Sequence, residues 1–265
     1  HYLMDKADYV FLPFYLEKKP AEKGVRRQYC YYTQFSPSLI FGSGDEQVKE
    51  RLLTPLVHSL HGSIHTKLEL YAMLKSLTGV HIGFLDVSRA YDRACEYKAS
   101  CVEQWKKIYE NQTQGRKDLA VVLLGRPYTI LSGYMNKGIP DIFASLGIRV
   151  FFQDMLSCSD EAVAPVQGLL DEIHWHYASE ILKAAQGVAL SKGVYPVLVT
   201  SFRCSPDSFA IDYFKKIMEA HEKPYLILQL DEHASSVGYE TRIEAGIRSF
   251  ENHFYARPGN KAVVY

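Results

Sequence analysis

The sequence lacks an excess of charge of either sign. Its 265 residues contain 30 lysines and arginines against 30 aspartates and glutamates, which gives a formal net charge of zero. Nucleic-acid binding depends on an excess of basic residues that neutralise phosphates, so a general nucleic-acid binder is excluded. The sequence also has no apolar run near the roughly 20 residues of a membrane-spanning helix, which argues against membrane insertion.

Cysteine is scarce, and no Cys-x-x-Cys pair occurs among Cys30, Cys95, Cys101, Cys158 and Cys204. An odd number of cysteines in a chain of this size argues against a disulfide framework. The missing pairs exclude a zinc ribbon and a ferredoxin-type cluster motif. We expect the protein to work in a reducing cytoplasm.

Apolar runs and helical periods alternate over residues 119–253. The apolar runs predict strands over 119–124, 149–153, 195–200 and 225–230. The segments between and after them predict helices over 136–146, 171–190, 205–221 and 241–253. Strands that alternate with helices are typical of an α/β fold with a parallel, doubly wound, Rossmann-like sheet. No glycine-rich phosphate loop accompanies these strands.

The pattern is weaker before residue 119. It predicts a strand over 9–14 and helices over 45–60, 67–78 and 88–111. We therefore expect two lobes: a mostly helical α/β lobe over residues 1–117, and a Rossmann-like lobe over 118–265. The first residues contain neither a start methionine nor a helix cap, and we expect the chain to be part of a longer protein.

The unusual residues follow the predicted strands. Ligands of open parallel sheets bind outside the carboxyl ends of the strands. Those ends lead here to Arg126, Cys158, Cys204 and the run Asp231, Glu232 and His233, while Cys30 follows the strand over 9–14 after a connector. We expect Cys30, Cys158 and Cys204 to face a common cleft, and Cys95 and Cys101, inside a long helix, to be structural.

Cys204 has the most favourable local sequence for a reactive thiol. Ser205 and Pro206 resemble a helix cap and a first helical residue, respectively. The amides and dipole of that helix would lower the pKa of the Cys204 thiol and favour a metal-binding thiolate. The alternative is a small buried apolar side chain.

Three thiolates at one edge of a sheet could hold three corners of a [4Fe–4S] cluster and leave the fourth iron open. Zinc bound by the same cysteines and His233 is the alternative. Asp231, Glu232 and His233 could also act as acid, base or hydrogen-bond donor, or could only fix the entry of the final helix. Arg126 and Arg242 could bind an anion or form a strand-end salt bridge.

A series of motifs occurs in a fixed order along the second half of the chain. The motifs are Leu124-Gly125-Arg126-Pro127-Tyr128, Asn136-x-Gly138-Ile139-Pro140, Phe202-x-Cys204-x-Pro206-Asp207-Ser208-Phe209, Lys223-Pro224-Tyr225-Leu226, Leu230-Asp231-Glu232-His233 and Thr241-Arg242-x-Glu244-Ala245. This series resembles the acyl-CoA dehydratase activase-related proteins, which contain regions related to the iron–sulfur subunits of 2-hydroxyacyl-CoA dehydratases and benzoyl-CoA reductases.

The resemblance implies a role in anaerobic metabolism. In the wider family an ATPase activator drives low-potential electrons into a partner whose [4Fe–4S] clusters are bound by cysteines. Carried over to this chain, the resemblance implies Cys204, Cys158 and Cys30 as cluster ligands, ATPase activase modules of the same or another chain as partners, and an acyl-CoA as a possible substrate. The alternative is a non-catalytic scaffold, or a zinc- or small-molecule-binding domain, that docks the activase modules.

Overall fold

The computed structural model describes residues 2–3, 5–18, 25–43, 46–57, 62–77, 79, 81–115, 118–201, 204–231 and 237–256. The chain divides into two compact units. The first comprises His1–Ser100 and Glu172–His176, and the second comprises Cys101–Asp171 and Tyr177–Tyr265.

The second unit is built on a four-stranded parallel sheet, which confirms the predicted α/β class. Its strands are β5 (Ala120–Leu124), β6 (Arg149–Phe152), β7 (Val194–Ser201) and β8 (Leu226–Leu230), in the order β6-β5-β7-β8. Every neighbouring pair is parallel. All five residues of β5 are buried, as expected for a strand covered on both faces.

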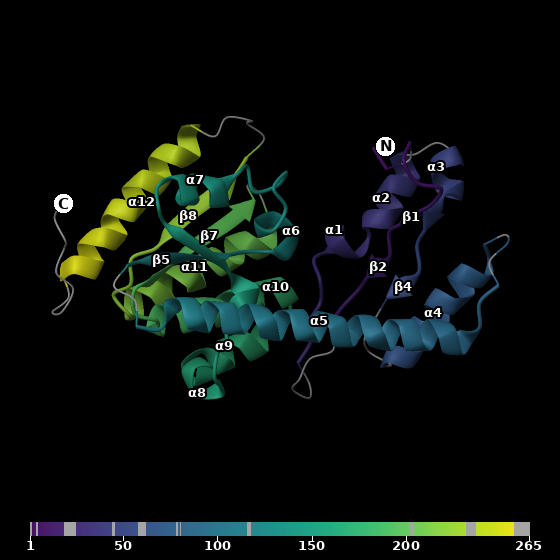
Figure 1. The fold of residues 1–265 in the computed structure, drawn as a ribbon, viewed down its shortest axis with the longest axis horizontal. Helices are drawn as coiled ribbons and strands as arrows, with labels where there is room; N and C mark the ends of the chain where they lie inside the picture. Colours follow the sequence, from purple (N-terminus) through teal and green to yellow (C-terminus); the bar gives the residue numbers. More distant parts are fainter. Residues whose placement is uncertain are drawn as a thin grey trace. The chain divides into compact units, whose positions relative to one another are not determined.

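Helices cover both faces of this sheet (Figure 1). On one face, α7 (Ile139–Ser145) and α12 (Val237–Ala256) supply Phe143 and Phe250 to a core that includes Val121 and Leu123. On the other face lie α10 (His176–Leu190) and α11 (Ser205–Ala220), whose buried residues include Leu182 and Phe214. The remaining short helices of the chain's second half are α6 (Pro127–Ile130), η1 (Gln153–Met155), α8 (Asp160–Val163), η2 (Ala164–Val166) and α9 (Gln167–Glu172).

The first unit contains short parallel strand pairs and several helices. β1 (Val10–Phe11) pairs with β3 (Leu52–Leu53), and β2 (Phe14–Tyr15) pairs with β4 (Leu56–Val57). The helices are α1 (Tyr31–Gln34), α2 (Ser36–Ser43), α3 (Glu46–Glu50), α4 (Ser63–Lys75) and the first part of α5 (Phe84–Thr113). This mixture agrees with the predicted, more helical α/β lobe.

Two secondary-structure predictions fare differently in this half of the chain. The long helix predicted over 88–111 is confirmed by α5, which extends a few residues further at each end. The helix predicted over 45–60 is wrong, because β3 and β4 follow α3 within that range. The backbone amides of Val10, Leu12 and Phe14 donate to carbonyls of residues 51, 53 and 55, and this ladder holds the segment extended.

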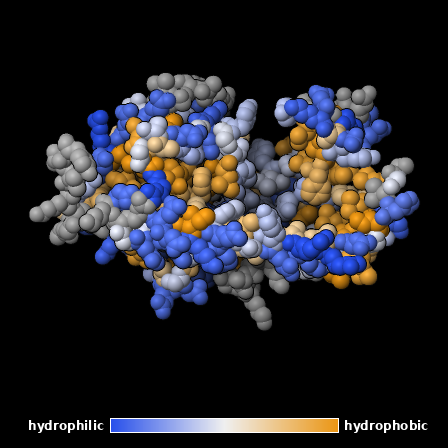
Figure 2. Space-filling model, viewed as in Figure 1, coloured by the Kyte–Doolittle hydropathy of each residue, from blue (hydrophilic) through white to orange (hydrophobic). Residues whose placement is uncertain are grey.

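The first unit leaves many large apolar side chains at its surface. Orange residues gather over α2 and its neighbouring strand in Figure 2, where Phe35, Leu39 and Ile40 are exposed. Among the described residues of 1–100, the buried apolar side chains are those of Leu52, Val87 and the prolines Pro37 and Pro55. Hydrophobic burial is therefore concentrated in the second unit. Within the part of the chain that the structure describes, no helix is long and apolar enough to cross a bilayer.

Candidate functional site

The carboxyl ends of β5 and β7 form the topological switch point of the parallel sheet. These strands are neighbours, and the chain leaves β5 towards β6 on one side but leaves β7 towards β8 on the other. Loops diverge at such a point, and ligands of doubly wound sheets bind in the crevice that results. The segments that follow β5 and β7 contain Arg126 and Cys204.

Arg126 joins these two segments through a network of hydrogen bonds. Its Nη2 donates to Oδ2 of Asp207 at 2.8 Å and to Oγ of Ser201 at 3.0 Å, and its Nη1 donates to the hydroxyl of Tyr128 at 2.9 Å. Both side chains of the ion pair are more than nine-tenths buried. Of the guanidinium nitrogens, buried Nε has no partner among the described residues. Arg126 therefore holds the start of α11 against the loop after β5.

Gly125 fixes where this arginine lies. A Cβ at this position would lie 2.7 Å from the carbonyl oxygen of Val199 and 2.7 Å from Cγ2 of Ile130. The amide of Gly125 donates to Oε1 of Gln153, at the end of β6, at 3.2 Å. The loop after β5 is thus packed against β7 and tied to β6.

Electrostatics stabilise the Arg126–Asp207 pair. Burial lowers the pKa of the Arg126 guanidinium, but the carboxylate of Asp207, the hydroxyl of Tyr128 and the thiol of Cys204 together outweigh this effect and place the pKa above its ordinary value. Burial raises the pKa of the Asp207 carboxyl, and Arg126 and the amide of Ser201 oppose that shift. The amide of Ser201 donates to Asp207 Oδ2 at 3.2 Å. The arginine therefore remains charged at neutral pH.

Cys204 lies at the amino end of α11, beside this pair. It occupies the N-cap position that the sequence assigned to Ser205, and the helix begins at Ser205, the first residue of the predicted range. The predicted lowering of its pKa is wrong. Burial raises the pKa of the Cys204 thiol and outweighs the amide of Asp207 and the charge of Arg126, which lower it. The free thiol is consequently protonated at neutral pH.

Cys158 lies in a different environment within the same unit. Its Sγ lies 3.7 Å from the carbonyl oxygen of Lys183 on α10. A Cβ on Gly187 would lie 2.5 Å from that sulfur, so the thiol fills the space left by the glycine. Burial raises the pKa of the Cys158 thiol as well.

Two contacts separate Cys158 from the site around Arg126. The ring of Tyr177, at the start of α10, lies 5.9 Å from the ring of Tyr128, which belongs to that site. Gly187 lies ten residues later in the same helix, about 15 Å further along its axis. Cys158 therefore packs against the later part of α10, whereas Cys204 lies at the N-cap of α11. No set of three or more His, Cys, Asp or Glu side chains suited to a metal ion occurs among the described residues.

The other predicted site cysteine belongs to the first unit. Cys30 is the N-cap of α1, and its Sγ lies 3.2 Å from Oγ1 of Thr33. Cys95 and Cys101 lie on α5, as predicted, with Cys95 exposed and Cys101 partly buried.

Of the three candidate residues that follow β8, Asp231 lies among the described residues. Asp231 lies at the end of β8, where its Oδ1 accepts a hydrogen bond from the hydroxyl of Tyr239 on α12 at 3.3 Å. This contact is the helix-fixing role that the sequence left open. Glu232 and His233 lie outside the described residues. Arg242 donates from Nη2 to the carbonyl of Ile227 at 2.8 Å, so it links α12 to β8.

Sequence reasoning missed four residues of the Arg126 site as functional candidates: Tyr128, Gln153, Ser201 and Asp207. Asp207 was the most accessible to prediction, since it stands in the first turn of a helix just after a strand end, in the motif that also contains Cys204. The contact between Gln153 and Gly125 has no sequence signal, because it joins two different loops.

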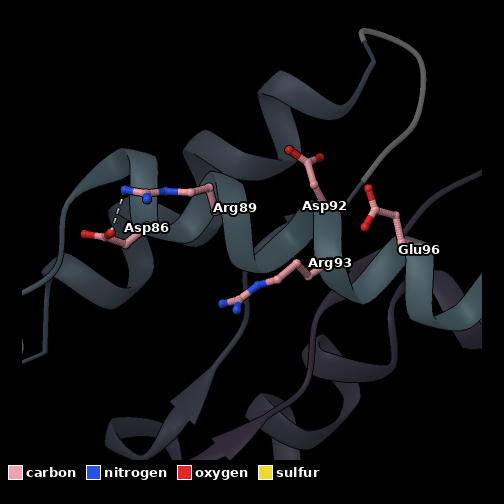
Figure 3. A pocket seen from close by; sticks show the side chains of 5 residues that line it. All are labelled: Asp86, Arg89, Asp92, Arg93 and Glu96. Carbon is pink, nitrogen blue, oxygen red and sulfur yellow. Dashed lines mark hydrogen bonds and ion pairs between the residues drawn. The ribbon is translucent and has the colours of Figure 1, made fainter.

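A separate hollow of about 420 Å³ lies along the first half of α5. It is lined by Asp86, Arg89, Asp92, Arg93 and Glu96, shown in Figure 3. Arg89 pairs with Asp86 at 3.2 Å, and Asp92 pairs with Lys67 at 2.7 Å. Charges of both signs on one exposed helix face, paired with each other, are typical of a solvated surface.

Comparison with known proteins gives one match. A family model described as the CoA enzyme activase uncharacterised domain (DUF2229) matches residues 1–156 of the chain. The match ends after η1, so β7, β8 and Cys204 follow the matched part. Searches of curated proteins and of solved structures found no match.

Proposed function

The chain belongs to the family of the CoA enzyme activase uncharacterised domain, and from this premise we propose that it is a component of an enzyme activase system with its centre at the Arg126 site. The family assignment agrees with the resemblance to acyl-CoA dehydratase activase-related proteins. The observation that carries the proposal is the buried Arg126–Asp207 pair beside Cys204, at the switch point of a parallel sheet. Buried titratable groups whose pKa values are shifted by burial and by a charged partner are characteristic of functional sites.

The chemistry of this centre follows from its three side chains. Arg126 is a fixed cation whose position is set by Asp207, Ser201 and Tyr128. Its buried Nε is the guanidinium nitrogen left to donate to a ligand. Cys204 supplies a thiol that loses its proton when a soft metal binds, because the thiolate is the form that coordinates a metal. Arg126 can therefore orient a hydrogen-bond acceptor of a ligand beside the sulfur of Cys204.

The finer proposal concerns iron and electrons. Cys204 contributes one ligand to an iron–sulfur centre that accepts or relays low-potential electrons, with ATP hydrolysed by an activase module elsewhere. Cys158 is packed against α10, so the other ligands of the centre would be residues other than Cys158. An acyl-CoA is the proposed substrate class of the whole system.

Anaerobic reconstitution of the full chain tests this proposal. Iron and sulfide are quantified in the wild type, in Cys204→Ser and in the matched control Cys158→Ser. We expect Cys204→Ser to lose iron and sulfide, and Cys158→Ser to retain the wild-type amounts. Retention by Cys204→Ser, or loss only in Cys158→Ser, would refute a role for Cys204 in cluster binding.

A second candidate is a non-catalytic scaffold that docks activase modules. It is favoured by the raised pKa of the Cys204 thiol and by the separation of Cys158 from Cys204. In this case the wild type would bind no iron after reconstitution, and a pull-down with an activase module would be unaffected by Cys204→Ser. The two candidates therefore give opposite results with the same protein.

A further inference from the structure

Two neighbouring segments, around Lys18 and Arg27, meet a distant one, around His176, and bring positive charges together in the first unit. The backbone amide of Lys18 donates to the carbonyl of Arg27 at 2.9 Å, and Arg27 Nη1 donates to the carbonyl of Ile173 at 3.0 Å. The backbone amide of His176 donates to the carbonyl of Gln28 at 2.8 Å. These contacts align the segments around residues 18, 27 and 176 beside one another.

The positive charges of Lys18 and Arg27, and that of Lys98 on α5, all act on the imidazole of His176. Burial first, and then the charges of Lys18, Arg27 and Lys98 in that order, lower the pKa of the His176 imidazole to about 4. The whole chain has a formal net charge of zero, so this is a local concentration of positive charge. Like charges brought together in this way repel each other unless an anion lies among them.

The lysines of this group are available to a ligand. Lys18 and Lys98 are exposed, and neither forms an ion pair with a carboxylate in the described ranges. Arg27 is buried and donates to main-chain carbonyls, so it contributes a fixed positive charge beside the two exposed lysines. Aromatic rings border the group: Tyr29 lies edge-on to His176 at 5.4 Å, and exposed Tyr31 lies edge-on to Trp175 at 5.5 Å.

We infer that Lys18, Arg27 and Lys98 form a binding site for a phosphate-bearing anion in the first unit. Ammonium groups bind phosphates as point charges, which suits two exposed lysines near a guanidinium that is held in place. The exposed ring of Tyr31 gives an adjoining surface on which a base can stack. The site involves neither Arg126 nor Cys204, so it goes beyond the proposed function and stands or falls separately from it.

Titration calorimetry of the full chain with inorganic pyrophosphate tests the inference. We expect saturable binding in the wild type and at least a roughly tenfold loss of affinity in Lys18→Gln/Lys98→Gln, because two charge-assisted contacts are removed. The matched control is Lys49→Gln/Lys106→Gln, which removes two lysines that pair with carboxylates of their own helices. Absence of saturable binding, or equal loss in both double variants, overturns the inference.

A second readout does not depend on affinity. The pKa of His176, followed by NMR, should rise in Lys18→Gln/Lys98→Gln, because two cations near the imidazole are removed. It should also rise when pyrophosphate binds to the wild type. A pKa unchanged by both the substitutions and pyrophosphate would overturn the site.

The same experiment with ADP identifies the part of the ligand that is recognised. Tighter binding of ADP than of pyrophosphate, with the difference lost in Tyr31→Ala, supports a site for a nucleoside phosphate. Equal binding of both probes supports a site for the phosphate groups alone.

Discussion

At Gly125, in the loop that contains Arg126, there is no room for a larger side chain. We expect Gly125→Ala to lower the free energy of unfolding by about 1–3 kcal/mol, since its methyl group would overlap the carbonyl of Val199 and the side chain of Ile130. Urea denaturation measures this loss. The matched control is Gly168→Ala in α9, where an added Cβ meets nothing within 4 Å. Equal stability of the two variants would contradict the packing described for Gly125.

The buried ion pair gives a second prediction at this scale. Asp207→Asn leaves the charge of Arg126 buried without its counterion, and we expect a loss of about 3–5 kcal/mol in the free energy of unfolding. Glu46→Gln, which breaks the exposed pair with Lys49, should cost about 0–1 kcal/mol. Chemical denaturation of both variants at neutral pH is the measurement. Similar small losses in both would show that Asp207 is not a buried partner of Arg126.

At the scale of elements, the start of α10 makes stability depend on pH. His176, its first residue, has a pKa of about 4 in the folded chain, against the ordinary 6.5. The unfolded chain therefore takes up a proton below pH 6.5 that the folded chain refuses until about pH 4, so stability falls as pH drops through this window. The loss should reach about 3 kcal/mol at pH 4.

Unfolding measurements between pH 7 and pH 4 check this dependence. His176→Gln removes the titrating group, and its stability curve should be flatter than that of the wild type by the same amount. Identical curves for the two proteins would show that His176 is protonated equally in the folded and unfolded states.

The elements also show what the sequence can and cannot predict. β5 and β7 were predictable because strands buried on both faces of a parallel sheet are continuous apolar runs. β3 and β4 were not, because strands of two residues have no period of their own and form only by pairing with the segment over 10–15. The sequence placed Arg126 and Cys204 at strand ends, but the hydrogen bond from Arg126 to Asp207 depends on tertiary structure.

Cysteine chemistry was harder to predict than position. The sequence placed Cys204 at the amino end of a helix, and the structure agrees. Its pKa depends on burial, which a local motif does not contain, and burial reverses the predicted direction. The packing of Cys158 against Gly187 joins segments 29 residues apart and likewise has no local signal.

At the scale of the whole molecule, the two units differ in how much apolar surface they bury. The second unit has a buried core on both faces of its sheet, whereas the described part of 1–100 contains four buried apolar side chains, two of them prolines. We expect amide hydrogen exchange to be slowest in β5 and β7 and faster in β1 to β4, because burial and cooperative pairing set local stability. Equal protection of both sets of strands would contradict this difference.

The most direct test of the Arg126 site is the pH dependence of Cys204 alkylation, followed by mass spectrometry on the folded chain. We expect the midpoint for Cys204 to lie above that of a cysteine in an unstructured peptide, because burial raises the pKa of its thiol. In Arg126→Gln the midpoint should rise further, since the nearby guanidinium favours the thiolate. A midpoint below that of the peptide, unchanged by Arg126→Gln, would contradict the arrangement of Cys204, Arg126 and Asp207 on which the proposed function depends.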